Sequence, residues 1–398
     1  MKIAILTSRY PHVTRTFVFE PVRWIEDQGH QVWVIASRRG SLQSSLPAPA
    51  SSVTLESLPL GGEVMAGARH PLRFLRNLRR ARALGRRARP SATRIARLAT
   101  LPEIAGADHL LAHFGPVGLR WLPVAAVARR RFSVFFHGYD CSSYPRKRPG
   151  VYQRLFASGA GILTNGEHTR SLLLELGAPP DRVGVVRLAA DPAFRHASWS
   201  PCTGPRRVLT IGRLVQKKGI DDSLEAFARS SRAISEEWRY QVIGDGPLRG
   251  ELTALVERHG LQGSVELRGF AGRSEVLESL AAASLFVLAS KTAPTGDSEG
   301  TPVSIMEAAT LGVPVVSTRH AGIPELLPPE AEREGFLVRE GDVGALSAAI
   351  TRLMGDPELR QRWGEACRSF AFSHYSPQRH ARDLVAALEQ YGRVPRLE

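Results

Sequence analysis

An alternation of short apolar runs with helical patterns constrains the fold most. The chain opens with an apolar run over 2–8 that ends in turn residues, which predicts a buried parallel strand. A helical pattern over 16–28 follows, closed by Gly29, and a second apolar run covers 31–36. This order of elements predicts a βαβ opening.

The same alternation continues in two series. In the first, we expect strands at 109–113, 132–136, 161–164 and 183–187, with helices near 121–130, 151–158 and 167–176. The stretch 189–205, rich in Pro, Gly and Ser, predicts a linker. In the second series, we expect strands at 208–211, 240–243, 265–267, 285–288 and 313–317.

Two successive series of this kind predict an α/β chain of two doubly wound, Rossmann-like domains that face each other. We place the first domain at 1–189 and the second at 190–375. A last helix within 376–398 is expected to pack on one of the two, with the first as the candidate. Ligands of such folds bind outside the carboxyl ends of the strands and between domains, so we expect a cleft there.

The length and the apolar pattern bound the remaining classes. At 398 residues the chain is long enough for two or three domains. No stretch approaches the roughly 18 apolar residues of a membrane span, and the apolar start is too short for a signal peptide, so we expect a soluble cytoplasmic protein. Cys141, Cys202 and Cys367 have no metal-ligand spacing, and no metal site is expected.

Most of the net charge of +15 comes from one segment. Residues 64–102 contain eleven arginines and no acid. Phe74, Leu78 and Ala81 recur there at helical spacing, while Arg76 and Arg80 fall on the other side. A basic amphipathic helix of this kind predicts contact between segment 69–97 and an anionic membrane surface. A solvated arginine-rich helix is the alternative. No nucleic acid is expected, since aromatic residues are scarce and do not interleave with the basic run.

The loop 211–219 carries the strongest chemical signal. It follows an apolar run, and in it Gly212 frees the backbone ahead of Arg213 and Lys218. A forked guanidinium and a compact ammonium, placed before a helix, suit a diphosphate. Arginine is common in this chain, but two of its only five lysines stand at 217 and 218. A plain surface loop is the less favoured interpretation.

A second signal covers 298–309. Pro302 fits the first turn of a helix, so the amides of Gly300, Thr301 and Val303 should lie near a helix N-terminus that favours a phosphate. In the same segment, Glu299 precedes the helix and Glu307 lies one turn after Val303 on the same face. Carboxylates so placed accept hydrogen bonds from sugar hydroxyls. A helix with a favourable acid before it and a solvated Glu307 is the alternative.

Together these segments resemble the retaining glycosyltransferases of family 4, which have the GT-B fold. The resemblance covers nearly the whole chain. It rests on G-R-L-x-x-K-K-G at 212–219, I-G-D-G-P at 243–247, the pair Glu299/Glu307 in its E-G-x-P context, G-V-P-V-V-S-T at 312–318 with the following A-G-I-P-E-L, and F-H-G-Y-D at 136–140. The first half also resembles the colanic-acid type of exopolysaccharide enzyme, through Thr16 to Glu20, Gly29-His30 and Ala112 to Gly115.

The resemblance implies that domain 1–189 binds the acceptor and domain 190–375 the nucleotide-sugar donor. It also implies roles for individual residues. Arg213 and Lys218 would bind the donor diphosphate, Glu307 the ribose hydroxyls, and Glu299 the transferred sugar, with His137 near the anomeric carbon. The donor-side set is Gly212, Arg213, Lys218, Gly244, Glu299, Gly300, Thr301, Pro302, Val303 and Glu307. For His137, a histidine that structurally caps a strand end is the alternative.

The acceptor side is expected to include His12, Thr16, His113 and Asp140. Many family members have a Gly-Gly loop after the first strand, whereas this chain has Arg9-Tyr10-Pro11-His12, so the usual contact of that loop with the donor phosphate is in doubt. His12 is either an acceptor contact or an ordinary loop histidine. Asp140 either contacts the acceptor or only orients its loop.

The resulting hypothesis is a transfer of hexose from a UDP-sugar or GDP-sugar to a glycan or polyprenyl-linked acceptor, on the inner face of the membrane. No cofactor and no metal are expected, because the cationic loop neutralises the leaving diphosphate and no D-x-D pair is present. The resemblance implies retention of configuration. A nucleotide-sugar epimerase and a non-catalytic membrane-associated sugar-nucleotide-binding protein are the alternatives.

Overall fold

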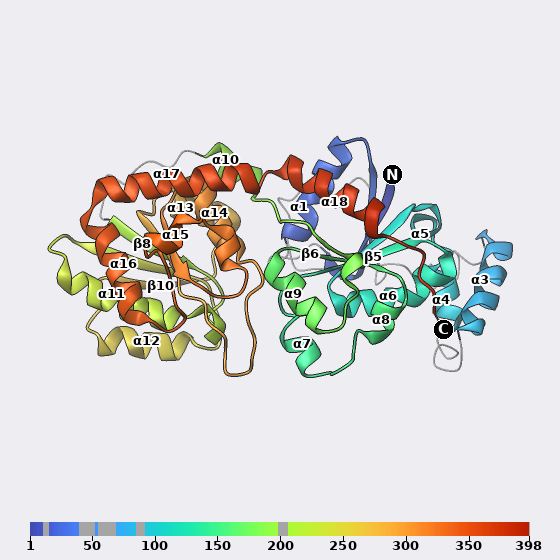
Figure 1. Ribbon diagram of the computed structural model, residues 1–398, viewed down its shortest axis with the longest axis horizontal. Coiled ribbons are helices and arrows are strands. Elements are labelled where there is room, and N and C mark those ends of the chain that lie inside the picture. Colours follow the sequence, from blue (N-terminus) through green and yellow to red (C-terminus); the bar gives the residue numbers. More distant parts are fainter. Residues whose placement is uncertain (11–15, 40–51, 55–68, 85–91, 198–205, 398) are drawn as a thin grey trace. The chain divides into compact units, whose positions relative to one another are not determined.

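The computed structural model describes the chain except residues 11–15, 40–51, 55–68, 85–91, 198–205 and 398 (Figure 1). The chain forms two compact units. Unit 1 contains Met1–Leu188 together with Gln378–Glu398, and unit 2 contains Ala189–Pro377. Each unit is a parallel sheet with its own helices, which agrees with the two series of strands that the sequence predicts.

Unit 1 is built on a parallel sheet with the strand order β3-β2-β1-β4-β5-β6-β7. The strands are β1 (Lys2–Tyr10), β2 (Gln31–Arg39), β3 (Ser52–Thr54), β4 (His109–His113), β5 (Arg131–Phe136), β6 (Gly161–Thr164) and β7 (Val183–Val185). Ile3, Ile5 and Leu6 of β1 are at most 1% exposed, because this central strand is covered on both faces. The apolar run at the start of the chain is therefore the middle of the sheet.

The helices of unit 1 cover both faces of that sheet. They are α1 (Thr16–Asp27), α3 (Pro71–Ala83), α4 (Ala92–Leu98), α5 (Pro102–Gly106), α6 (Gly115–Ala128), α7 (Ser143–Arg146), α8 (Gln153–Ala157), α9 (Glu167–Glu175), the 3₁₀ turn η2 (Pro180–Arg182) and α18 (Pro377–Tyr391). Because β1 to β2 and β4 to β5 run in opposite directions across the sheet, right-handed crossovers place α1 and α6 on opposite faces.

Helix α18 returns to unit 1 from the end of unit 2. Its His380 Nδ1 lies 2.6 Å from the carbonyl of Arg187, and its ring meets Trp24 of α1 edge-on at 6.4 Å between centroids. Residues after α18 continue along the same unit, where the Arg393 carbonyl accepts a hydrogen bond from the Phe132 amide of β5 at 2.9 Å. Figure 1 shows α18 beside α1.

Unit 2 repeats the design, with the strand order β10-β9-β8-β11-β12-β13, all parallel. The strands are β8 (Arg206–Ile211), β9 (Trp238–Ile243), β10 (Val265–Gly269), β11 (Leu285–Leu288), β12 (Val315–Thr318) and β13 (Leu337–Val338). The order reverses between β8 and β11. This reversal creates the crevice at the carboxyl ends where doubly wound sheets bind ligands.

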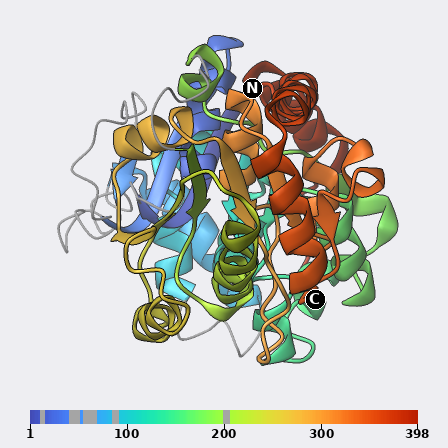
Figure 2. The ribbon, with the colours of Figure 1, turned by 90° about the vertical axis from the view of Figure 1, so that its left-hand side faces the viewer.

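The helices of unit 2 form two packed groups. They are α10 (Pro192–His196), η3 (Gln216–Lys218), α11 (Ile220–Ala233), α12 (Arg249–Arg258), α13 (Arg273–Ala281), α14 (Val303–Leu311), η4 (Ile323–Leu326), α15 (Glu330–Arg333), α16 (Val343–Gly355) and α17 (Pro357–His374). Helices α11 and α16 pack side by side (Figure 2), while α14 packs against α17. The predicted linker 189–205 contains α10, because Asp191 caps it by accepting from the Ala193 amide.

Candidate active site

Loops at the carboxyl ends of β8, β9, β11 and β12 form the candidate site of unit 2. The first two loops touch at glycines. Gly244 has φ +146°, and a Cβ there would lie 1.9 Å from the Gly212 carbonyl oxygen, so only glycine fits. A Cβ on Gly212 would in turn lie 3.2 Å from the Lys218 side chain. The two glycines that the sequence assigns to the donor side therefore let the Lys218 stem cross the loop.

The two lysines of this loop have different surroundings. Lys217 is 7% exposed, and its Nζ lies 3.0 Å from the Ser298 carbonyl and 3.3 Å from Asp297. The Lys218 Nζ lies 3.3 Å from the Glu299 carboxylate, its one ion pair among the described residues. Lys217 thus anchors the loop before α14, whereas Lys218 reaches the carboxylate that the sequence assigns to the sugar.

Glu299 is the centre of a buried charge cluster. It is 8% exposed, and burial opposes its ionisation, but the ammonium groups of Lys218 and Lys217 outweigh burial and hold the pKa of its carboxyl below the usual value. Its backbone amide donates to His320 Nε2 at 3.0 Å. Glu299 therefore stays ionised at neutral pH with its main chain fixed.

Sequence reasoning missed two residues of this cluster, His320 and Glu340. The His320 ring is 1% exposed, and its Nδ1 lies 2.6 Å from Glu340 Oε1. Because Nε2 accepts from the Glu299 amide, Nδ1 carries the proton and donates it to Glu340. A histidine just after the predicted strand 313–317 was a usable signal. Glu340 follows the two-residue strand β13, which is too short to leave a pattern.

Helix α14 begins beside this cluster. It starts at Val303, with Pro302 at the N-cap position instead of in the first turn that the sequence predicts, since its ψ of 108° is extended. No side chain caps this end, so its first amides keep donor capacity. Gly300 is buried, and its carbonyl lies against Gly322. Thr301, the residue between Gly300 and Pro302, is half-buried.

Arg213 and Glu307 complete the donor-side set that the sequence predicts. Arg213 is exposed on the loop after β8, and it forms no ion pair within the described parts of the chain. Glu307 lies one turn into α14 and is half-buried. Lys218 and Glu299 contact each other directly at 3.3 Å, Arg213 lies in the same loop as Lys218, and Glu307 lies on α14, the helix that Glu299 precedes.

Unit 1 has its own cluster at the carboxyl ends of β4 and β5. His137 follows β5, is 5% exposed and stacks on Phe135 at 5.0 Å between ring centroids. His113 ends β4, is also buried, and its Nδ1 lies 3.2 Å from His137 Nε2. Between the strands, Phe114 has φ +75°, a strained backbone of the kind found at functional sites. The histidines form a stacked, hydrogen-bonded pair.

Asp140 is fully buried beneath this pair. One carboxylate oxygen accepts from the His137 amide and the other from the Gly115 amide, each at 2.9 Å. The carboxylate therefore ties the loop after β5 to the start of α6. Its burial favours the loop-orienting role over the acceptor contact that the sequence also allows. His113 is also buried, and its ring contacts His137.

The two remaining acceptor-side candidates are less informative. His12 lies outside the described residues. Thr16 is the first residue of α1. Their assignment to the acceptor stays a prediction, and so does the cleft between the two domains. Among the described helices, none is long and apolar enough to cross a membrane.

Known proteins match both the sequence and the fold. Residues 194–370 match the family model described as glycosyl transferases group 1. The chain is 34% identical over 369 residues to the putative colanic acid biosynthesis glycosyltransferase WcaL of Salmonella typhimurium, which covers 88% of this chain and 90% of that protein. It is 31% identical over 371 residues to the amylovoran biosynthesis glycosyltransferase AmsK of Erwinia amylovora, covering 89% and 90%.

Among solved structures, Anabaena HepE in complex with UDP superposes with a TM-score of 0.73 at 18% identity, covering 98% of this chain and 100% of that one. WaaG, a glycosyltransferase involved in lipopolysaccharide biosynthesis, has a TM-score of 0.65 at 17% identity, covering 96% and 99%. These neighbours show the fold alone. Since the sequence relatives extend over nearly the whole chain, it belongs to the group 1 glycosyltransferases, and its two parallel-sheet units are those of the GT-B fold.

Proposed function

We propose that this chain transfers a hexose from a nucleotide-diphosphate sugar to a glycan or lipid-linked acceptor in exopolysaccharide synthesis. One observation carries the proposal: Lys218 and Glu299 meet at 3.3 Å in front of the uncapped start of α14, with the exposed Arg213 in the same loop as Lys218. The relatives named for colanic acid and amylovoran biosynthesis support the polysaccharide product. HepE, solved with UDP, supports the donor class.

The chemistry follows from where charge develops. As the bond between sugar and phosphate breaks, negative charge collects on the leaving diphosphate. Arg213, Lys218 and the first amides of α14 are fixed donors on the side where that charge appears, and preorganised donors are worth most in transition states. Glu299, kept ionised by its neighbours, accepts hydrogen bonds from the hydroxyls of the sugar and fixes its orientation.

We further propose that the reaction needs no metal and retains the anomeric configuration, as the resemblance to family 4 implies. The leaving phosphate oxygen takes the proton of an acceptor that attacks on the same face. Chelation with EDTA should leave the rate within about twofold of the parent, and NMR of the product should show the anomeric configuration of the donor. Loss of activity on chelation, restored by a divalent ion, contradicts metal independence. An inverted product contradicts retention.

Replacing Arg213 tests the donor site. Arg213→Ala should weaken donor binding and turnover together, because the guanidinium contacts the diphosphate in both ground and transition states. Arg232→Ala is the matched control, since Arg232 is exposed in the last turn of α11. Undiminished kinetics in Arg213→Ala would falsify this assignment. Thermal shifts with UDP, GDP and ADP identify the base, because a ligand that binds only the folded state raises Tm.

Product analysis separates transfer from the two alternatives. An epimerase converts the donor when no acceptor is present, whereas a transferase leaves most of it intact or hydrolyses it slowly. A non-catalytic binding protein binds the donor, with a calorimetric signal, but neither hydrolyses the donor nor transfers its sugar to any acceptor. Transfer to a polyprenyl-linked saccharide from the same source supports the proposal over both.

We also propose that unit 1 contacts an anionic membrane through α3. The apolar face that the sequence predicts points inward instead, because Ala81 belongs to the core and Leu78 packs against it. Arg80 also turns inward and donates to the Val127 carbonyl at 3.2 Å. What α3 exposes is Leu72 and Leu75, 83% and 53% exposed. Arg76, Arg79 and Arg82 are exposed alongside them. Exposed leucines among arginines suit an anionic leaflet.

Flotation with vesicles of phosphatidylglycerol and phosphatidylcholine tests this contact. The variant Arg76→Gln/Arg79→Gln/Arg82→Gln should float several-fold less than the parent. Added salt should reduce the fraction of the parent that floats with the vesicles. Arg232→Gln/Arg258→Gln controls for a general loss of charge, since both arginines are exposed on unit 2. Equal flotation of the α3 variant and the parent removes the proposal. Arg87, which the sequence also places on the basic face, lies outside the described residues.

A further inference from the structure

A second basic site lies in unit 1, at the amino ends of its strands. A hollow of about 1020 Å³ opens there, between the end of α6, the end of α8 and the segment 393–397 after α18. Strands β5 and β6 begin next to it, at Arg131 and Gly161, whereas His137 follows the other end of β5. At 3.3 Å per residue, Arg131 and His137 are roughly 20 Å apart along the chain. The hollow is therefore separate from the histidine cluster of unit 1.

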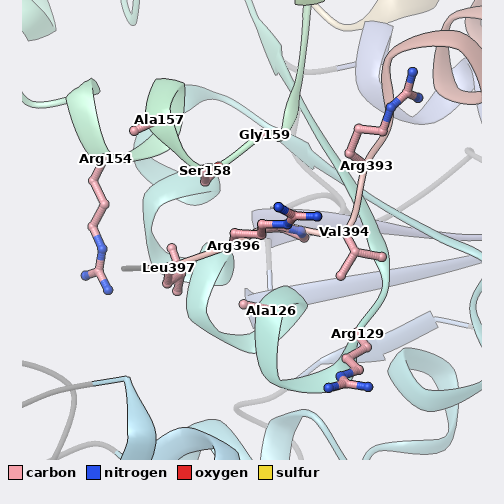
Figure 3. A pocket seen from close by; sticks show the side chains of 11 residues that line it. Ala126, Arg129, Arg154, Ala157, Ser158, Gly159, Arg393, Val394, Arg396 and Leu397 are labelled. Carbon is pink, nitrogen blue, oxygen red and sulfur yellow. The ribbon is translucent and has the colours of Figure 1, made fainter.

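Arginines dominate the walls of the hollow. Arg129, Arg154, Arg393 and Arg396 line it, and none of the described residues that line it is acidic. Arg393 is occupied locally, because its guanidinium donates to the carbonyls of Gln390 and Gly392 at 2.8 and 3.0 Å. The other three are exposed and form no ion pair within the described residues. Figure 3 shows Arg396 in the middle of the hollow, with Arg154 and Arg129 on two different sides of it.

The backbone fixes these three arginines from three separate elements. Arg129 is held in the left-handed region at φ +55° as the C-cap of α6, with its amide bonded to Ala126. The segment that carries Arg396 is tied down by its own amide, which donates to the Ser158 carbonyl at 2.8 Å. Arg154 lies on α8, the helix that ends at the hollow. Like charges are thus collected around one space by the fold itself.

Apolar groups share the walls. Val394, 43% exposed, and Leu397 lie on the segment after α18, and Ala126 and Ala157 face them from α6 and α8. The hollow therefore offers guanidinium forks beside a small apolar surface. Forked N–H groups match phosphate oxygens bidentately, so the walls of the hollow suit a compact anion such as a phosphate.

Helix α3 brings a further arginine close to the end of α6. Arg80 of α3 donates to Val127, two residues before Arg129. Burial lowers the pKa of Arg80, and the positive charges of Arg129 and Arg76 lower it further, because these guanidinium groups repel one another. An anion between them relieves this repulsion.

We propose that this arginine hollow is a phosphate-binding site, distinct from the donor site, which takes a phosphate monoester or diester with an apolar substituent. The phosphate would bind Arg396, Arg154 and Arg129, and the substituent would lie on Val394 and Leu397. Two sources provide this chemistry, a phospholipid headgroup and a soluble organic phosphate, and the experiment distinguishes them.

Calorimetric titration with two probes tests the site. The probes are sodium pyrophosphate and dihexanoyl phosphatidic acid below its micelle concentration, titrated into a chain whose donor site is disabled by Arg213→Ala/Lys218→Ala. Adding Arg154→Gln/Arg396→Gln should raise Kd at least tenfold for the probe that binds. Arg232→Gln/Arg258→Gln, an equal loss of charge on unit 2, should change Kd less than twofold. The same two arginine variants are also titrated in the chain with an intact donor site, which repeats the comparison.

The relative affinity of the probes identifies the source. Tighter binding of phosphatidic acid assigns the hollow to a lipid phosphate, and tighter binding of pyrophosphate assigns it to a soluble one. Absence of binding by both probes, or equal Kd in the Arg154→Gln/Arg396→Gln variant and its control, overturns the proposal. Nucleotide binding at the intact donor site should be the same in both arginine variants, so failure here leaves the proposed function untouched.

Discussion

The two units present opposite chemistry at the same edge of the same kind of sheet. Unit 2 collects ions there: Lys217, Lys218, Glu299 and, through His320, Glu340. Unit 1 collects aromatic rings, with His113 and His137 stacked and hydrogen-bonded above the buried Asp140. One fold thus supports a charged site and a weakly charged one. The difference fits the proposal that unit 2 binds the anionic donor while unit 1 contributes shape and hydrogen bonds.

Removal of Lys218 should have the largest effect on activity, because it disrupts the charged site of unit 2. Lys218→Ala takes away a cation that faces the diphosphate and leaves Glu299 with a weaker partner. We expect kcat/KM to fall by about 10²–10³ and donor binding to weaken, by analogy with the loss of one preorganised donor. Lys2→Ala is the control, since that lysine begins β1 at the opposite edge of unit 1. Wild-type kinetics in Lys218→Ala would remove the ionic cluster from the mechanism.

The second effect in size concerns the backbone of unit 2. Gly244→Ala forces a Cβ to within 1.9 Å of the Gly212 carbonyl, so the loop that carries Arg213 and Lys218 must move. We expect donor Kd to rise more than tenfold and Tm to fall, since strained backbone costs about 1–3 kcal/mol. Gly250→Ala on α12, where nothing lies within 4 Å of a new Cβ, is the matched control. Unchanged nucleotide affinity would show that the glycine contact is not needed.

The third effect tests the weakly charged site of unit 1. His113→Phe keeps the stack with His137 but removes the partner of its Nε2. We expect kcat to fall about tenfold with donor Kd unchanged, because His113 positions His137 and contacts no donor in this proposal. His113→Asn, which keeps a hydrogen-bonding side chain, should recover part of the rate. A rise in donor Kd equal to the loss of kcat would instead place the histidine pair in donor binding.

These contrasts show what the sequence could predict. The strands and the two series were readable because their apolar runs are buried on both faces, as in β1, β4 and β11. Gly212 and Lys218 were readable because they stand in a short motif after a strand, and Glu299 was readable because it stands in a short motif before a helix. The link between His320 and Glu340 was not, since it is a contact between residues twenty positions apart. No local pattern encodes that distance.

The helix α3 shows a second limit. Its periodicity correctly separates an apolar face from a basic one, but periodicity cannot tell which face meets the protein. Ala81 packs into the core of unit 1, and Arg80 turns inward to the Val127 carbonyl. Leu72 and Leu75 stay exposed although they are apolar. Tertiary packing decides which residues reach a membrane, and the sequence pattern does not contain it.

The smallest effect we expect is on stability at acid pH, and it should come from the carboxylates of unit 2. Burial opposes ionisation of Glu340, yet its bonds to the Thr292 amide and to His320 hold its pKa below the usual value, as the lysines do for Glu299. A carboxyl with a lowered folded-state pKa stabilises the fold above its unfolded pKa, about 4.3 for glutamate, and loses that contribution as pH falls through the folded value. Glu340→Gln should therefore lower the urea midpoint at pH 7 and flatten its fall between pH 5 and pH 3, measured by unfolding at each pH. Glu103→Gln, on α5 of unit 1, should leave that slope as in the parent. If Glu340→Gln keeps the parent's slope, the ionic cluster adds no pH-dependent stability, and the contrast between the two units is confined to ligand binding.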